Sequence, residues 1–226
     1  MGVYFGYAYG SNIGKLMGKT FTNYLFNELN VEPQNKSINS YNSLVMGYRS
    51  KHSSMQYQIG FTGSKEYANN GLVKLDGAFV MHGLSMYLHN SNVSNNKFLH
   101  YGVGMGYTLA KNTVNYTELQ TPLNLIEEPV KLVNYRGMPS ASVIFGIMKD
   151  DVGLDIEAGY RMQTNASTWE YRGSRLPFAP PSFTDGLKDD LLSLPFATVN
   201  VRLILPNTQP VYHPRSKDSD DEVAVD

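Results

Sequence analysis

The residues best suited to acid–base chemistry are a pair of carboxylates in the last third of the chain. Asp155 and Glu157 lie two residues apart, so on a β-strand both side chains point to one face, as a carboxylate pair requires. Arg161 and Arg202 lie in segments of the same pattern, and neighbouring arginines lower the pKa of carboxylic acids. The arrangement therefore favours a structural ion-pair network over acid catalysis.

Two histidines and a glycine repeat are the other chemical signals. His82 and His100 fall within strand-like segments, and His100 lies on the polar face, where a structural hydrogen bond to Asp or Glu is more common than a general base. The repeat Gly102-x-Gly104-x-Gly106 lacks the helix that follows a dinucleotide-binding motif. The chain has no cysteine, which excludes a thiol nucleophile and a Cys-ligated metal. We predict no catalytic residue, no metal and no cofactor.

The composition is typical of strands and turns. Charged residues make up 17% of the chain, against roughly 25% in soluble domains. The net charge of −1 gives no electrostatic footprint for nucleic acid. No apolar run is long enough for a transmembrane helix, whereas a membrane strand needs only about 9–11 residues with every second one apolar.

Apolar and polar residues alternate with period two in eight segments, the pattern of strands with two different faces. In the clearest segment, residues 99–109, Leu, Tyr, Val and Met alternate with His, Gly and Thr. The other segments cover residues 3–10, 41–50, 55–63, 72–88, 140–148, 152–163 and 195–205. The pattern predicts an all-β fold, an eight-stranded antiparallel up-and-down barrel.

One segment changes its phase. Leu75, Phe79 and Met81 share one parity, whereas Leu84, Met86 and Leu88 take the other. Because one extra residue exchanges the two faces of a strand, we predict a β-bulge near residues 82–83.

The predicted connections differ in length between the two ends of the sheet. Long loops at 11–40, 112–139 and 164–194 lie on one side, and very short turns at 51–54 and 149–151 lie on the other. Outer-membrane barrels have short periplasmic turns and longer external loops. The asymmetry therefore favours a membrane barrel with apolar side chains facing lipid and polar side chains facing the lumen.

The polar face is rich in glycine and poor in lysine, which suits a crowded lumen. Its charges are balanced, and we predict a lumen charge network of Arg49, Lys74, Asp76, Asp155, Glu157, Arg161 and Arg202. The alternative is that these are solvated charges on a soluble barrel. Tyrosines gather on the apolar face, as they do at membrane interfaces. The predicted lipid-interface residues are Tyr7, Tyr9, Tyr48, Tyr57, Tyr101, Tyr107 and Tyr160.

With these features the chain resembles the small outer-membrane barrels of Gram-negative bacteria, the OmpA/OmpX type, in a style similar to Bacteroidota proteins. The resemblance covers residues 1–206, the predicted transmembrane domain, and implies location in the outer membrane after removal of a signal peptide. Residues 207–226 are expected to form a disordered acidic periplasmic tail. His89 and Ser91 have a spacing similar to that in some lipid A deacylases, but the topology places them at a periplasmic turn, whereas those sites open outward.

The long loops are the best candidates for binding. Phe21, Leu25 and Leu29 are spaced as on one face of a short amphipathic helix, which could pack over the barrel mouth or dock a partner. The last long loop has aromatic residues among prolines, which could form a contact surface or cap the barrel. The predicted partner-binding residues are Phe21, Tyr24, Leu25, Trp169, Tyr171, Phe178 and Phe183.

These observations predict a non-enzymatic structural or accessory subunit that binds a partner through its external loops. The expected partners are outer-membrane lipid, lipopolysaccharide and another membrane or surface protein. A filled lumen argues against a general porin, since open aqueous channels need about 16–18 strands. The alternatives are a membrane-embedded hydrolase of lipid or peptide and a soluble ligand-binding barrel.

Overall fold

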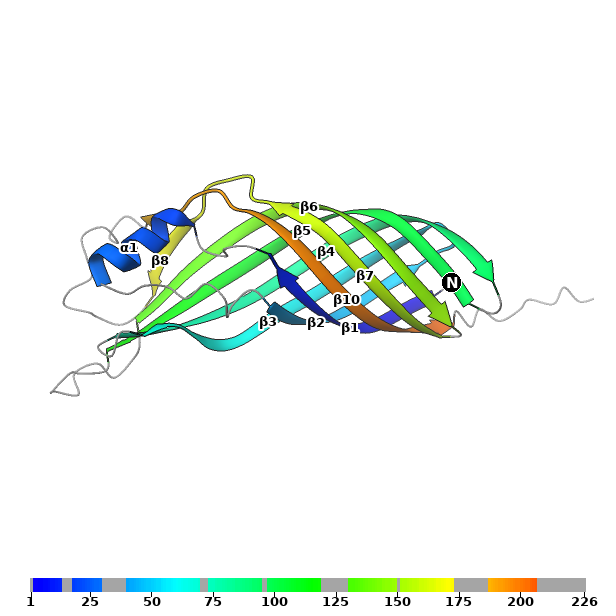
Figure 1. Ribbon diagram of the computed structural model, residues 1–226, viewed down its shortest axis with the longest axis horizontal. Helices are drawn as coiled ribbons and strands as arrows, with labels where there is room; N and C mark the ends of the chain where they lie inside the picture. The colour runs from blue at the N-terminus through cyan, green and yellow to red at the C-terminus, as the bar shows by residue number, and fades with distance from the viewer. Residues whose placement is uncertain are drawn as a thin grey trace, which may run out of the picture.

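The computed structural model describes residues 2–13, 18–29, 40–69, 73–94, 97–118, 130–149, 151–172 and 187–206. Its main feature is an antiparallel sheet that closes on itself (Figure 1). The barrel strands are β1 (Gly2–Asn12), β2 (Ser40–Arg49), β3 (Ser53–Asn69), β4 (Val73–Ser94), β5 (Lys97–Glu118), β6 (Val130–Lys149), β7 (Val152–Met162) and β10 (Ser193–Pro206). Each pairs with its neighbours along the chain, and β1 pairs with β10 to complete the ring. The predicted eight-stranded antiparallel barrel is confirmed.

Alternation along the strands is inverted relative to a soluble protein. On β1, Phe5 and Tyr7 point outward and are half-exposed, whereas Tyr4 points inward and is fully buried. The same holds on the far side of the barrel, where Met105 is 70% exposed and Asp155 only 1%. Apolar side chains therefore cover the outer surface of the barrel, and polar side chains fill its interior.

Glycines make this interior possible, because an eight-stranded barrel has little room inside. Gly47 is paired with Tyr4 across β1 and β2, and Gly104 is paired with Tyr87 across β4 and β5. A Cβ atom on either glycine would overlap the tyrosine ring opposite it. A large inward side chain is thus accommodated by a glycine on the adjacent strand.

The phase change in β4 has a different cause from the one predicted. The register of β4 with β5 runs without interruption from Val73 to Ser94, and the irregularities lie in β3, near residues 62–68. The predicted bulge near His82–Gly83 is therefore wrong. Leu75, Phe79 and Met81 instead point inward and are buried, while Leu84, Met86 and Leu88 point outward. Polarity inverts along one regular strand.

The sheet extends further than predicted on the side of the long connections. On that side, predicted loop residues 64–69, 112–118 and 130–139 belong to β3, β5 and β6, and at the short-turn end residues 89–94 belong to β4. The predicted helix is present as α1 (Lys19–Leu29), and the last long connection contains β8 (Thr168–Arg172) and β9 (Leu187–Lys188). Figure 1 shows α1 and β8 together at one end of the barrel, opposite the N-terminus. These elements form an extension beyond the barrel mouth.

Among the described residues, no helix is both long and apolar enough to cross a membrane.

The inverted surface makes a prediction about where an outward charge is tolerated. Met105→Arg, in the middle of the apolar surface of β5, should lower the free energy of unfolding in liposomes by about 2–4 kcal/mol, the cost of a cation at mid-membrane. Leu191 is also an exposed apolar side chain (59%), but it lies before β10, outside the barrel wall. Leu191→Arg should therefore lower the free energy of unfolding far less. Denaturant titration in liposomes measures both, and equal small effects would contradict a lipid-facing surface.

Candidate functional site

A cluster of charged side chains fills the lumen near the short-turn end. Asp155 on β7 pairs with Arg202 on β10, and its other oxygen lies 2.8 Å from Nε2 of His100 on β5. Arg49 on β2 approaches the same His100 nitrogen at 3.4 Å. The Arg202 guanidinium also lies 5.0 Å from the centroid of the Tyr4 ring. All five side chains are buried, so the carboxylate serves as counterion to buried arginines.

A second polar layer lies nearer the long connections. Arg161 donates hydrogen bonds to Asn12 Oδ1 at 2.7 Å and to the Tyr41 hydroxyl at 3.1 Å. Its guanidinium lies 3.9 Å from the centroid of the Phe196 ring, a cation–π contact. Between the two layers, Glu157 accepts hydrogen bonds from Ser142 and Tyr87. The lumen between these two layers is therefore occupied by polar groups that contact one another.

The structure corrects part of the predicted lumen network. It places Arg49, Asp155, Glu157, Arg161 and Arg202 on the inner face. Lys74 and Asp76, however, share the outward parity of Val80, because β4 has no bulge. They form their own ion pair at 3.1 Å on the outer face of the extension, where both are partly exposed to water.

The crowding of the charged cluster makes a prediction about Gly146 on β6. A methyl group on Gly146 would overlap the Asp155 carboxylate and the His100 ring, whereas nothing lies within 4 Å of a Cβ placed on Gly63. Gly146→Ala should therefore destabilise the barrel by roughly 1–3 kcal/mol, the usual cost of overpacking. Gly63→Ala, a strand position with free space, is the control. Equal unfolding midpoints of the two variants in denaturant would contradict a filled lumen at this level.

At the other end, the barrel mouth is closed by apolar packing. Phe21 and Tyr24 of α1 and Trp169 of β8 belong to one buried cluster with inward side chains of β4, β5, β6 and the residues before β10. The Phe21 and Trp169 rings are stacked, with centroids 3.8 Å apart and an interplanar angle of 12°. Of the two readings of the predicted helix, packing over its own barrel mouth is the one that the structure shows.

A buried aspartate holds this closure together. Asp189, between β9 and β10, accepts hydrogen bonds from Arg136 at 2.6 Å and from Trp169 Nε1 at 2.9 Å. It also accepts backbone N–H groups of Gly18 and Phe21 at the start of α1, at 3.1 and 3.3 Å. One carboxylate thus joins β6, β8 and α1. Sequence reasoning missed Asp189 and Arg136, because their partners are distant in the sequence and no local pattern marks them.

The adjacent Asp190 completes the cap of α1. Its carboxylate accepts the backbone N–H of Thr20 at 2.8 Å and the Thr20 hydroxyl at 3.0 Å. These hydrogen bonds hold the pKa of Asp190 below its ordinary value, so the cap is charged at neutral pH. An acidic group at a helix N-terminus is also favoured by the helix dipole. The start of α1 is therefore fixed by two carboxylates from a remote segment.

The predicted partner-binding residues divide into three groups. The side chains of Phe21, Tyr24 and Trp169 are buried in the closure, so they are not available at the surface. Leu25 lies in α1 and Tyr171 in β8. Phe178 and Phe183 lie outside the described residues.

The closure makes a prediction with an internal reporter, because Trp169 is the single tryptophan. Asp189→Asn removes the counterion of a guanidinium that is almost fully buried, which typically costs about 3–5 kcal/mol. Trp169 fluorescence should therefore shift to the red at lower denaturant concentration than in the native chain. Asp190→Asn, which changes an exposed carboxylate, should shift the transition much less. Coincident transitions for the two variants would contradict the role of Asp189.

The predicted interface tyrosines all point outward, with exposed fractions of 36–54%. Tyr9 and Tyr160 lie near the long-connection ends of β1 and β7, and Tyr48 and Tyr101 near the short-turn ends of β2 and β5. Polar residues on the same surface have tyrosine partners: His82 Nδ1 lies 2.9 Å from the Tyr57 hydroxyl. Such pairing satisfies polar groups at an apolar surface.

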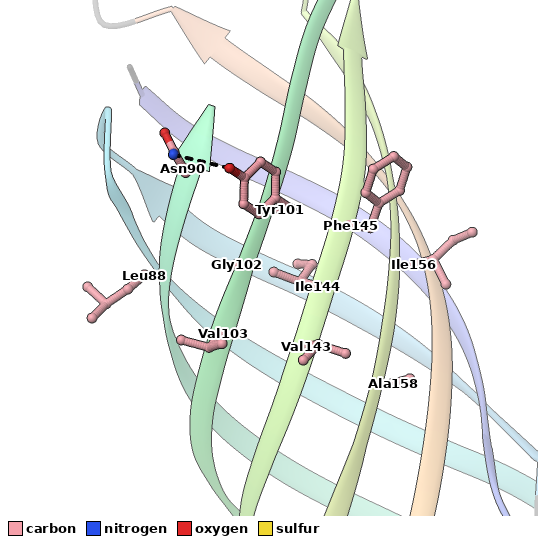
Figure 2. Close-up of a pocket in the computed structure, with 10 residues that line it drawn as sticks. All are labelled: Leu88, Asn90, Tyr101, Gly102, Val103, Val143, Ile144, Phe145, Ile156 and Ala158. Atoms are coloured by element: carbon pink, nitrogen blue, oxygen red, sulfur yellow. Dashed lines mark hydrogen bonds between the residues drawn. The ribbon is translucent and has the colours of Figure 1, made fainter. Parts of the chain in front are cut away.

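A shallow depression of about 610 Å³ lies on the outer face of β4 to β7 (Figure 2). Its walls are mostly apolar side chains, among them Val103, Phe145 and Ile156. The hydrogen bond drawn in Figure 2 runs from Asn90 to the Tyr101 hydroxyl, at 3.2 Å. Since the two polar groups engage each other, the depression presents hydrocarbon to its surroundings and no reactive group.

The candidate catalytic residues are engaged in structural contacts or separated from one another. His82 points outward to Tyr57, whereas His100 is buried against Asp155. His89 points inward and is buried, near the short-turn end of β4. Within the described segments, no group of three or more His, Asp or Glu side chains is placed to hold a metal ion. Among the side chains that the structure describes, the geometry does not assemble a nucleophile, base and oxyanion site.

No protein-family model and no curated protein matches this sequence. Among solved structures, the chain is similar to a major outer membrane protein from Thermus thermophilus, with a TM-score of 0.55 and 10% identity over 91% of this chain and 100% of that one. CarO2 of Acinetobacter baumannii aligns over the same shares at 10% identity, but with a TM-score of 0.34. The first likeness shows the fold: this chain has the closed antiparallel barrel of outer-membrane proteins.

Proposed function

We propose that this protein is an integral barrel of a bacterial outer membrane that neither conducts solutes nor catalyses a reaction, and that presents its extension to a partner. The observation that carries the proposal is the inverted barrel: apolar side chains cover the outside while charged side chains fill the inside. In water that arrangement would expose a large apolar surface, which soluble monomers avoid. In a bilayer it satisfies both surfaces. A source among the Bacteroidota and an OmpA/OmpX relationship stay predictions.

The filled interior supports a non-conducting role. The ion cluster around Asp155, the layer around Arg161 and the apolar closure around Trp169 follow one another along the barrel axis. Opening a path would require breaking buried ion pairs, which costs several kcal/mol each. The barrel therefore acts as an anchor that holds the extension at a fixed place above the membrane.

The extension supports a role in partner binding. Ile13, Phe26 and Leu191 are apolar side chains with exposed fractions of 60%, 54% and 59%. They lie on the segment after β1, on α1 and before β10, at the loop end of the barrel. Exposed apolar side chains on a rigid element are typical of contact sites. In place of the buried Phe21 and Trp169, these residues are the proposed partner contacts.

Two measurements test the proposal. The purified protein in planar bilayers should give no stable conductance, because its lumen is filled. A photo-crosslinking amino acid at Phe26 should give a discrete cross-linked product in cells of the source organism, and the same probe at Lys51, exposed at the opposite end, should not. Steady ohmic channels would contradict the closed lumen, and identical products from both probes would contradict binding by the extension.

A further inference from the structure

Two basic side chains lie over a tyrosine ring on the outer face of the extension, and a third basic residue lies beside one of them. Lys111 Nζ on β5 lies 5.8 Å from the centroid of the Tyr135 ring on β6, and Arg172 Cζ on β8 lies 5.7 Å from the same centroid. Lys131 on β6 is directly opposite Arg172 in the register of the two strands. All four residues are exposed. The cluster is thus held by three neighbouring strands, not by a loop.

The cluster has more positive than negative charge. Arg172 pairs with Glu170 at 3.2 Å, and both side chains stay more than half exposed. Asp76, on the outer face of β4, is engaged by Lys74 at 3.1 Å. Among the residues that the structure describes, no ion pair engages Lys111 or Lys131. In the part of the chain that the structure describes, the three cations are therefore accompanied by one carboxylate, which leaves capacity for an anionic ligand.

The position of the cluster indicates where that ligand lies. On β5 the outward residues run Met105, Tyr107, Leu109 and then Lys111, so the first cation follows directly on the apolar surface. Lys111 is four residues past Tyr107, roughly 13 Å along the tilted strand. The headgroup layer adds about 5–8 Å on each side of the hydrocarbon, and long basic side chains reach toward it. The cluster therefore begins at the headgroup layer with Lys111 and continues away from the apolar surface with Lys131 and Arg172.

We propose that Lys111 and Arg172, which lie over Tyr135, together with Lys131 opposite Arg172, bind the phosphate groups of lipid A, the membrane anchor of lipopolysaccharide. The inference rests on the proposed outer-membrane location. Guanidinium groups bind phosphate oxygens in a bidentate manner, and lysines add point charges. Because the cluster continues into the apolar surface of Leu109 and Met105, its ligand is an amphiphile with phosphates above acyl chains. A soluble acidic partner would not use that surface.

The test is lipid binding by the full-length protein in detergent, measured by native mass spectrometry. The probes are lipid A with both phosphates, the same lipid dephosphorylated, and inorganic phosphate as competitor. The variant K111Q/K131Q/R172Q should bind diphosphoryl lipid A on the order of tenfold to a hundredfold more weakly than the native chain. The matched control K51Q/K149Q removes cations that lie at the short-turn end and should bind as the native chain does.

Several outcomes would overturn the assignment. Equal binding of dephosphorylated lipid A, or undiminished binding by the triple variant, would exclude phosphate recognition by this cluster. Full displacement by inorganic phosphate would show a free anion as ligand, and loss of the Phe26 cross-linked product in the triple variant with lipid binding intact would show a protein interface. K111R/K131R should retain binding, which separates charge from folding. Failure of the proposed location would appear differently, as a protein that stays in solution without detergent.

Discussion

In the proposed outer-membrane location, the absence of water from the membrane core is the constraint on which this structure depends. Hydrocarbon cannot hydrogen-bond a charge or a backbone amide, so the strands must close into a ring and the polar side chains must turn inward. Once inside, Arg49, Arg202 and Asp155 must satisfy each other, because an isolated buried charge is far too costly. The glycines opposite large inward residues follow from the same constraint, since the narrow lumen leaves no other room.

The inversion of polarity along β4 marks where that constraint ends. Toward the short-turn end, Leu84, Met86 and Leu88 point outward. Toward the long connections, Met81, Phe79 and Leu75 point inward. On β5, paired with β4, the outward residue changes from Leu109 to Lys111 while Ala110 and Val114 become buried. The pairing of β4 with β5 is regular through this change, so the change of side reflects different surroundings and not an extra residue in β4. The extension is therefore organised as an ordinary soluble protein, with an apolar core inside and charges outside.

The sequence predicted the barrel because period-two alternation can be recognised within each segment. Lipid outside the barrel requires apolar residues on one face of a strand, and the lumen requires polar residues on the other. The same reasoning failed for Lys74 and Asp76, because it assumed one polarity rule for a strand that crosses two solvents. It also ended the strands too early, since residues such as Asn112 and Thr113 lose the apolar alternation once outside the membrane. A phase change at matching register in adjacent strands, here Met81 opposite Ala110, would have distinguished a solvent boundary from a bulge.

The two ends of the barrel are closed by different kinds of interaction, and the difference bears on function. The short-turn end is closed by ion pairs, which hold their geometry through directional contacts to Asp155. The mouth is closed by the stacked Phe21 and Trp169 rings, and the Asp189 carboxylate accepts a hydrogen bond from Trp169. Since Asp189 contacts α1, β6 and β8 together, a displacement of any one of them loosens the other two. Lys131 and Arg172, on the outer face of β6 and β8, belong to the same pair of strands whose inner face contacts Asp189. The outer cluster and the closure are therefore both built on β6 and β8, and in the proposed location these strands hold α1 at a fixed distance from the membrane.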